Sequence, residues 1–459
     1  MRPQSCFRIA VVFIVLTLLL QAFSTSANFR SRTGCEISQS RPSIQSAFAD
    51  LGSLLSCPTG PGFVPLSNVY PPTGIFVGYT PQTEKFIQQL AEAIGRFPDP
   101  PQINVIVEAP QLQEAKQRLT HLLKGPLPTF VRLLSSQQEN VFWIQDAMEF
   151  GSHAGKSAIL DLPNYYNDGP EDLPEELSQQ CGIEFIPQLE TFDDEPDGSE
   201  VGGNIESYPG GVLAVGRNLD PELLRYLKGE TNQRVVTLDT DWLSTGHVDE
   251  LFTVVPSKKE PCGFAVLHAS PALGLELLKE IRQETRTAPL EPEFPGRKIT
   301  PSRTPGAPRG CMKDLPRAQL SRPLTVSEAL ACSEFIAMNS NLELRIQADL
   351  ALLIGAIADR TGCHEVRTIP LPLLFVPDPL DNEKAEALNP NLINGLVLNQ
   401  VIIQPKQPHP FFERAATRLL REIGVEAIFT DGSVFHFLGG GIHCGTHALR
   451  ACNELASPN

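Results

Sequence analysis

The chain has 459 residues, of which 41% are hydrophobic and 20% charged, a composition typical of a globular protein with a sizeable core. Its formal net charge of -16 would repel a polyanion, which argues against a nucleic-acid partner. The sequence contains neither a glycine-rich dinucleotide loop nor a phosphate-binding loop, which argues against a nucleotide cofactor.

The first residues have the pattern of a secretory signal peptide. Arg2 and Arg8 precede an apolar run at 9–20, and small residues are frequent between 22 and 27. The run is shorter than the roughly 20 apolar residues that span a bilayer. We therefore expect residues 1–27 to be removed and the mature protein to be secreted, without stable membrane association.

The rest of the chain predicts an entry segment followed by one large domain. Residues 28–70 are polar and rich in Ser, Pro and Gly, and we expect them to be poorly structured. Residues 71–459 alternate short β-type runs with amphipathic helical patterns, which predicts an α/β architecture. The predicted strands are 103–107, 158–162, 212–215, 235–238, 264–268, 366–370 and 396–403. The predicted helices are 85–97, 112–123, 272–284, 327–338, 344–361 and 412–423.

Three segments interrupt this alternation. Residues 164–177 and 190–203 form acidic loops that contain Gly and Pro, and a Pro- and Arg-rich insertion lies at about 291–322. Loops of this length are usually functional or mobile, and a solvated insertion is favoured for the last one.

The cysteine count bears on the chemistry because export favours disulfides. The chain has 10 cysteines, and Cys6 would leave with the signal peptide, so 10 - 1 = 9 would remain. Since nine is odd, at least one thiol cannot pair within the chain. The count alone does not say which one.

Four short segments combine residue types that can carry catalysis: 143–149, 202–206, 246–250 and 439–446. The last places Cys444 between Gly441 and Gly445, and such a glycine-dense turn can present a cysteine as a nucleophile. A buried structural cysteine or a disulfide partner is an equal alternative on this pattern alone.

A second feature is the pair His247 and Asp249. Alternation predicts a strand at 248–254, which would place both side chains on the same face. With Cys444 they could form a triad for amide hydrolysis, or each could contact a substrate separately. Asp146 adds a second carboxylate, and two carboxylates suit a planar guanidinium better than a neutral amide. Since both would raise the pKa of the thiol, the His247 imidazolium or the substrate's charge must compensate.

These residues lie in segments that resemble the protein-arginine deiminase family. The stretch 241–250, which reads DWLSTGHVDE, is closely similar to the family, and 143–150, 203–206, 391–398 and 434–446 are similar in the same order. The resemblance covers roughly residues 70 to 450. It implies the family's fold, a five-bladed ββαβ propeller (pentein) with its active site at the centre.

The resemblance also implies roles. Cys444 matches the nucleophile, Asp146 and Asp249 match the carboxylates that bind the guanidinium, and His247 matches the general acid and base. Trp143 matches the aromatic wall beside the arginine side chain. The implied reaction is hydrolysis of arginine to citrulline and ammonia through a covalent thiouronium on Cys444, a hydrolysis of C–N bonds in linear amidines.

The family uses Ca²⁺, and the resemblance assigns one calcium site beside the catalytic residues. Its ligands would be the side chains of Gln145, Glu149 and Glu206 and the carbonyl oxygens of Gly202 and Ile205, all hard oxygen donors of the kind that calcium prefers.

The identity of the substrate stays open between a protein- or peptide-bound arginine and a small molecule such as free arginine or agmatine. Asn164 and Tyr166 stand where the animal enzymes have arginines that hold the substrate backbone. A Cys-His peptidase and a catalytically silent secreted binding protein of the same fold are further alternatives.

Overall fold

The computed structural model describes residues 62–163, 172–187, 201–230, 233–284, 324–378, 381 and 383–451. The predicted signal peptide and the insertion at 291–322 lie outside these residues, so those expectations stay untested. Most of both acidic loops also lies outside them, but residues 173–177, expected at the end of the first loop, belong to the helix α5 (Leu173–Cys181). Within the described ranges no helix combines the length and apolarity needed to cross a bilayer.

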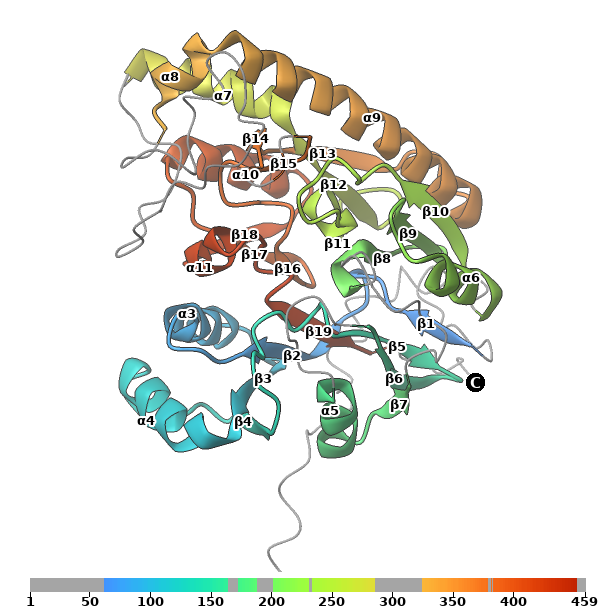
Figure 1. The fold of residues 1–459 in the computed structure, drawn as a ribbon, viewed down its shortest axis with the longest axis vertical. Coiled ribbons are helices and arrows are strands. Elements are labelled where there is room, and N and C mark those ends of the chain that lie inside the picture. Colours follow the sequence, from blue (N-terminus) through green and yellow to red (C-terminus); the bar gives the residue numbers. More distant parts are fainter. Residues whose placement is uncertain are drawn as a thin grey trace, which may run out of the picture.

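Five small sheets share one connectivity (Figure 1). In one of them, β8 (Ile205–Tyr208) pairs antiparallel with β9 (Val212–Gly216), and α6 (Pro221–Glu230) then leads to β10 (Arg234–Leu238), which pairs parallel with β9. Each unit is therefore a ββαβ blade. The predicted five-bladed propeller is confirmed.

Three other blades have the same order. The second blade contains β5 (Met148–His153), β6 (Lys156–Asp161), α5 (Leu173–Cys181) and β7 (Glu184–Ile186). The fourth contains β11 (Phe252–Pro256), β12 (Phe264–Ser270), α7 (Pro271–Glu284) and β13 (Arg367–Pro372). The fifth contains β16 (Leu396–Leu398), β17 (Val401–Pro405), α10 (Pro410–Glu422) and β18 (Glu426–Thr430).

The first blade closes the ring with segments from both ends of the described chain. β19 (Thr446–Arg450) pairs antiparallel with β2 (Pro72–Gly78), and α3 (Glu84–Ile94) then leads to β3 (Gln102–Glu108), parallel to β2. A fourth strand, β4 (Val131–Ser136), follows α4 (Leu112–Leu122) and extends this sheet. The loop that carries Cys444 directly precedes β19 and is thus joined to the N-terminal blade.

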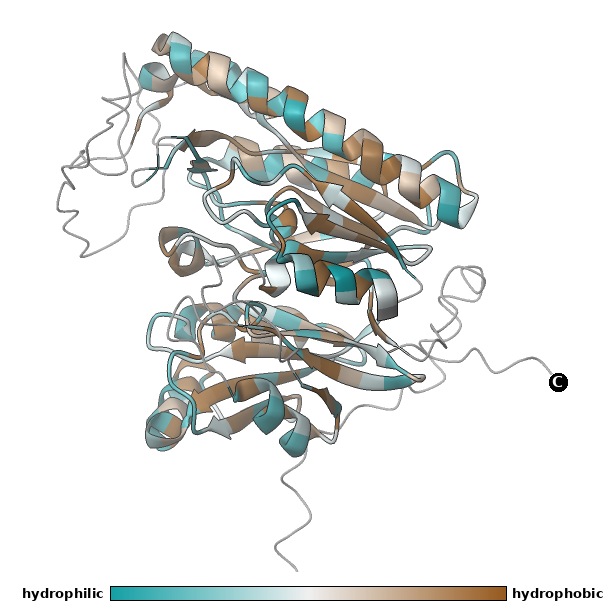
Figure 2. Cartoon of the chain, turned by 45° about the vertical axis from the view of Figure 1, so that its right-hand side comes forward, coloured by the Kyte–Doolittle hydropathy of each residue, from teal (hydrophilic) through white to brown (hydrophobic). Residues whose placement is uncertain are grey.

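The apolar residues explain why these segments fold as they do. All five residues of β9 and all seven of β12 are buried, as in strands covered on both faces. In α3 the apolar residues three and four apart, Phe86, Leu90 and Ile94 among them, form the buried face. Figure 2 shows mostly hydrophobic residues in the strands, whereas hydrophobic and hydrophilic residues alternate along the helices.

Most predicted elements match observed ones, but four do not. The predicted strand 396–403 is the hairpin of β16 and β17, which turns at Asn399 with a φ of 57°. The predicted helices 327–338 and 344–361 are instead α8 (Val326–Ala331) and a 29-residue helix, α9 (Ser333–Thr361), separated by the extended backbone of Cys332. The predicted strand 248–254 begins as a 3₁₀ turn, η4 (Val248–Glu250), and only β11 is extended.

The expected domain boundary at residue 70 is also wrong. β1 (Phe63–Pro65) pairs with β5, and Phe63 and Val69 are buried, so the folded part includes residues 62–70. The apolar residues Phe63, Val64 and Val69 lie among the polar residues that suggested disorder. The rest of the 28–70 segment lies outside the described residues.

The remaining helices and strands lie outside the ββαβ order of the five blades. A 3₁₀ turn, η2 (Ala109–Gln111), precedes α4, and α11 (Ser433–Phe437) precedes the Cys444 loop. A hairpin of β14 (Phe375–Pro377) and β15 (Ala385–Ala387) follows the fourth blade. The long helix α9 packs across the third and fourth blades, against β9, β10 and β12.

A disulfide joins Cys262, just before β12, to Cys363, just after α9, with a sequence separation of 101 residues. Because this bond closes a long loop in the unfolded chain, we expect the Cys262→Ala/Cys363→Ala double variant to lose about 2–5 kcal/mol of unfolding free energy. Urea unfolding followed by circular dichroism measures the change. An unchanged midpoint and slope would contradict this prediction.

Candidate active site

The candidate site lies where five loops meet. Each loop directly precedes the first strand of a blade. Equivalent ends of the five blades therefore contribute to one site. Figure 1 shows these first strands, β5, β8, β11, β16 and β19, near the centre of the ring. The residues that come from these loops are Asp146 before β5, Gly203 before β8, Asp249 before β11, Asn394 before β16 and Cys444 before β19.

Two glycines allow the loops to approach one another. They belong to the 3₁₀ turn η3 (Gly202–Asn204). A Cβ on Gly203 would lie 2.6 Å from His247 Nδ1 and 3.3 Å from both carboxylate oxygens of Asp249. A Cβ on Gly202 would lie 2.2 Å from the carbonyl oxygen of Gln145. The third blade's loop therefore fits between the second and fourth only because these positions lack side chains.

Cys444 lies at the middle of this arrangement and is 3% exposed. It is the free cysteine among the described residues, since Cys262 and Cys363 are joined and Cys181 and Cys332 are also disulfide-bonded. Its Sγ lies 3.4 Å from Asp249 Oδ2. The prediction that Cys444 is the unpaired thiol is confirmed within this part of the chain.

The charges around Sγ strongly favour the neutral thiol. Burial raises the pKa of Cys444 well above its ordinary value, and the nearby carboxylates Asp249, Glu250 and Asp146 raise it further. A hydrogen bond from the backbone N–H of Gly441 acts in the opposite direction. A cation placed among these carboxylates would therefore promote the thiolate.

Asp146 and Asp249 supply two buried carboxylates for such a cation. Oδ1 of each has no hydrogen-bond partner within the described residues. Burial, reinforced by Asp249, raises the pKa of Asp146 to about 8. Two carboxylates with unused acceptor atoms are suited to the forked N–H groups of a guanidinium.

His247 is buried beside Asp249, although for a different reason than the sequence pattern indicated. The pair does not lie on one face of a strand, because His247 immediately precedes η4 and Asp249 lies within it. Both side chains instead come close to Gly203. A different histidine, His443, has its Nδ1 3.0 Å from Asp249 Oδ2. This contact was not predicted.

Trp143 is half-buried next to the nucleophile loop. A Cβ on Gly440 would lie 2.8 Å from the indole and 3.5 Å from the Cβ of Cys444, so the bare backbone of Gly440 passes between the two side chains. This position agrees with an aromatic wall beside a bound side chain. The catalytic and binding roles of all these residues stay predictions.

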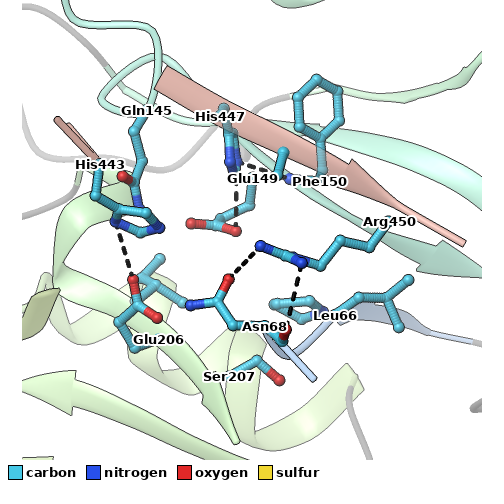
Figure 3. Close-up of a pocket in the computed structure, with 13 residues that line it drawn as sticks. Leu66, Asn68, Gln145, Glu149, Phe150, Glu206, Ser207, His443, His447 and Arg450 are labelled. Carbon is cyan, nitrogen blue, oxygen red and sulfur yellow. Dashed lines mark hydrogen bonds and ion pairs between the residues drawn. The ribbon is translucent and has the colours of Figure 1, made fainter. Parts of the chain in front are cut away.

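Four of the five predicted calcium ligands line a cavity of about 20 Å³ beside the thiol, which is space for about one water molecule or ion. They are Gln145, Glu149, Ile205 and Glu206. Figure 3 shows Gln145, Glu149 and Glu206 around this cavity together with His443, His447 and Arg450. The fifth predicted ligand, Gly202, lies against Gln145 and Glu149.

The carboxylates of this cavity are only partly compensated by donors. Burial, with repulsion from Glu206 and Asp249, raises the pKa of Glu149 well above its usual value. Burial also raises the pKa of Glu206 to about 7, although His443 opposes this shift. Gln145 Oε1 and Glu149 Oε1 have no hydrogen-bond partner among the described residues.

The neighbouring nitrogens relieve this deficit only in part. His447 Nε2 lies 3.7 Å from Glu149 Oε2, but it accepts a hydrogen bond from the backbone N–H of Phe150 and so does not donate to the carboxylate. Arg450 donates to the backbone oxygens of Asn68, Tyr70 and Val397 and to Asn68 Oδ1. The donor set therefore fits a hard divalent cation that binds oxygen.

Sequence reasoning missed four residues of the site: Asn394, His443, His447 and Arg450. Asn394 and His443 lie inside segments already selected, and polar residues beside the nucleophile could have been noted there. Regular alternation along β19 would place His447 and Arg450 on opposite faces. A register shift between Leu449 and Arg450 brings both to the same cavity, and the sequence does not show it.

The chain is similar in sequence to proteins of a known family. The model of the protein-arginine deiminase (PAD) family matches residues 99–455. Human protein-arginine deiminase type-1 is 29% identical over 344 residues, which cover 68% of this chain and 47% of that protein. Mouse protein-arginine deiminase type-4 is 26% identical over 349 residues, with the same coverage. The chain thus spans about half the length of the curated relatives it matches.

Solved structures with the same fold include agmatine deiminases. A putative agmatine deiminase aligns with a TM-score of 0.53 at 14% identity and covers 86% of this chain and 98% of its own. The agmatine deiminase of Enterococcus faecalis aligns with a TM-score of 0.52 at 13% identity, covering 87% and 98%. At this identity the likeness shows a shared fold.

The raised carboxyl pKa values predict a pH dependence of stability in the metal-free protein. Asp146 and Glu206 have folded pKa values of about 8 and about 7, above their ordinary values of 3.8 and 4.5. Their protonated forms therefore stabilise the fold below about pH 4, and this contribution is lost as the pH rises through 7 and 8. We expect the free energy of unfolding in chelator to fall by a few kcal/mol over this range.

An Asp146→Asn/Glu206→Gln double variant is the control, because it cannot ionise at these positions. Urea unfolding at pH 5, 7 and 8.5 should show the variant gaining on the wild type as the pH rises. Parallel pH curves for the two proteins would contradict the prediction.

Proposed function

Because the chain belongs to the protein-arginine deiminase family, we propose that it hydrolyses the guanidinium of protein- or peptide-bound arginine to citrulline and ammonia. The observation that carries this proposal is the buried Cys444 thiol, 3.4 Å from Asp249, in the field of a second carboxylate, Asp146. Both carboxylates have an acceptor atom without a partner in the described structure. A neutral amide substrate would bring no positive charge to offset these carboxylates.

The arriving guanidinium supplies the positive charge that the site lacks. Held by Asp146 and Asp249, it offsets the carboxylates that disfavour the Cys444 thiolate, so the thiol gives its proton to His247 and the nucleophile forms with the substrate in place. The thiolate then forms an S–C bond to the guanidinium carbon. His247 gives a proton to the departing nitrogen as the C–N bond breaks, and ammonia leaves a thiouronium on the cysteine.

Water completes the reaction. His247 takes a proton from a water molecule, whose oxygen bonds to the same carbon, and the C–S bond breaks to return the thiol and release citrulline. Trp143 would exclude solvent on one side of the substrate. Its half-buried indole next to Gly440 and the cysteine supports this role.

A calcium ion is proposed to bind Gln145, Glu149 and Glu206, with the carbonyl oxygens of Gly202 and Ile205. Bound there, it would supply positive charge beside the reaction centre. The unpartnered Oε1 atoms of Gln145 and Glu149 and the buried carboxylates support the assignment. Glu206 lies 3.5 Å from His443 Nδ1, which also contacts Asp249, so the cation cavity and the substrate carboxylates share one neighbour.

The first test is ammonia release from a blocked arginine peptide, with calcium and with chelator. We expect activity from the wild type in calcium, a loss of at least about 100-fold in chelator, and none from Cys444→Ala. Citrulline detected by mass spectrometry identifies the product. Equal activity of the Cys444→Ala variant would eliminate the assigned nucleophile, and full activity in chelator would refute the calcium site alone.

The main alternative is a deiminase of free arginine or agmatine. Asn164 and Tyr166, which would decide how a peptide backbone is held, lie outside the described residues. A substrate series of blocked arginine peptide, free arginine and agmatine separates the two functions. The proposal predicts the highest kcat/KM for the peptide, and a higher value for either small substrate would favour the alternative. A silent binding protein would act on none of them.

We also propose that the protein is secreted. The predicted signal peptide at 1–27 motivates this, and the Cys262–Cys363 disulfide supports it because such bonds persist in oxidising compartments. N-terminal sequencing of protein recovered from culture medium checks the proposal. Retention inside the expressing cells with residues 1–27 intact would contradict it.

A further inference from the structure

Asn394 makes contacts on three sides of the nucleophile loop and is completely buried. Its side-chain Nδ2 lies 3.1 Å from Cys444 Sγ, and its Oδ1 accepts a hydrogen bond from the Cys444 backbone N–H at 3.2 Å. Its carbonyl oxygen accepts a hydrogen bond from the backbone N–H of His443 at 3.2 Å. No sequence pattern had assigned this residue a role.

The orientation of the amide is fixed by its surroundings. The Cys444 backbone N–H requires an acceptor, so Oδ1 must face it and Nδ2 must face the sulfur. A Cβ on Gly441 would lie 2.2 Å from Asn394 Oδ1, so the amide reaches this position only because residue 441 is glycine. The N–H donor is therefore aimed at Sγ by steric and hydrogen-bonding constraints together.

The loop that carries Asn394 is tied to the substrate carboxylates. Asn391 Nδ2 donates to the backbone oxygen of Glu250 at 2.9 Å and to its Oε2 at 2.6 Å. Asn391 Oδ1 accepts hydrogen bonds from the backbone N–H groups of Ile393 and Asn394. Glu250 follows Asp249 in the chain. One continuous hydrogen-bond network therefore holds both Asn394, the donor to Cys444 Sγ, and the Asp249 carboxylate beside that sulfur.

The charge of the surroundings gives this donor its importance. Asp146, Asp249 and Glu250 all act on Cys444 with negative charge, whereas Asn394 and the Gly441 N–H present the positive ends of neutral dipoles. The neutral amide of Asn394 keeps its N–H donor whether the neighbouring carboxylates are protonated or ionised. It also introduces no cation that would compete with the guanidinium for Asp146 and Asp249.

We propose that Asn394 is a catalytic residue that donates a hydrogen bond to the Cys444 sulfur, stabilising its anionic form and orienting it for attack. The proposal rests on the proposed function only in taking Cys444 as the nucleophile. Its role is separate from substrate binding, so its loss should lower kcat and leave KM nearly unchanged.

Asn394→Asp is the sharpest test, because the two side chains have the same shape. Aspartate keeps an acceptor for the Cys444 N–H but replaces the donor to Sγ with a carboxylate oxygen. The readout is the rate of Cys444 alkylation by iodoacetamide at pH 7.5, followed by mass spectrometry of the Cys444 peptide. We expect this rate to fall at least about tenfold, since a hydrogen bond to a charged group contributes on that order.

Asn389→Asp is the matched control. Asn389 is equally buried and lies in the same approach to β16, but its Nδ2 donates to Gln407 Oε1 and not to the thiol. Both variants lose one buried donor and gain one carboxylate, so similar losses in Tm are expected. Wild-type alkylation in Asn389→Asp together with slow alkylation in Asn394→Asp would support the proposal.

Asn394→Ala provides a second variant if the Asn394→Asp protein does not fold. Slow alkylation of Cys444 in Asn394→Ala, with a Tm no lower than that of Asn389→Asp, would support the proposal. Wild-type alkylation rates and kcat in either folded Asn394 variant would overturn it. The outcome is independent of the deiminase assignment. If slow alkylation is found but the wild type forms no citrulline, Asn394 keeps its role and the proposed function fails.

Discussion

The site depends on one physical constraint, which is the burial of many negative charges in a small volume. Asp146, Glu149, Glu206, Asp249 and Glu250 are all buried at the centre of the ring. Removing a carboxylate from water is expensive unless it is paired or hydrogen-bonded, and here several oxygens are neither. Two resident basic groups compensate only part of this charge: His443 contacts Glu206 and Asp249, and Arg450 acts on Glu206. The arrangement is therefore prepared to receive cations from outside, one at the reaction centre and one in the adjacent cavity.

The propeller is well suited to assembling such a centre. Each blade contributes a short loop before its first strand, and no loop carries more than a few charges of its own. Because the blades are rigid ββαβ units with buried strands, the repulsion among the loops is opposed by apolar packing within the blades. Gly202 and Gly203 then let the third loop come within contact distance of the second and fourth. A flexible scaffold would relax by moving the carboxylates apart.

The sequence predicted the elements of this fold better than their arrangement. Strands such as β9 and β12 are continuous apolar runs that periodicity detects, but the ring was inferred only from the resemblance to a known family. The hairpin of β16 and β17 was read as one strand because both of its arms are apolar and the turn at Asn399 is short. His247 and Asp249 lie close together as expected, but a 3₁₀ turn and the close approach of Gly203 bring them there, not one face of a strand. Asn394 contacts residues far away in the chain, and Arg450 reaches the cavity through a strand irregularity. Neither feature leaves a local pattern in the sequence.

Closure of the ring by β19 bears on when the protein becomes chemically competent. The Cys444 loop follows α11 and leads directly into β19, the first strand of the first blade, whose partner β2 lies near the other end of the described chain. A growing polypeptide emerges with β2 before the other four blades and with β19 after them, so the thiol meets its carboxylates only once those blades have been synthesised. A chain that stops before β19 can hold the acidic loops, but it cannot bring them together with the cysteine loop. Reactivity is thereby delayed until β19 has been synthesised.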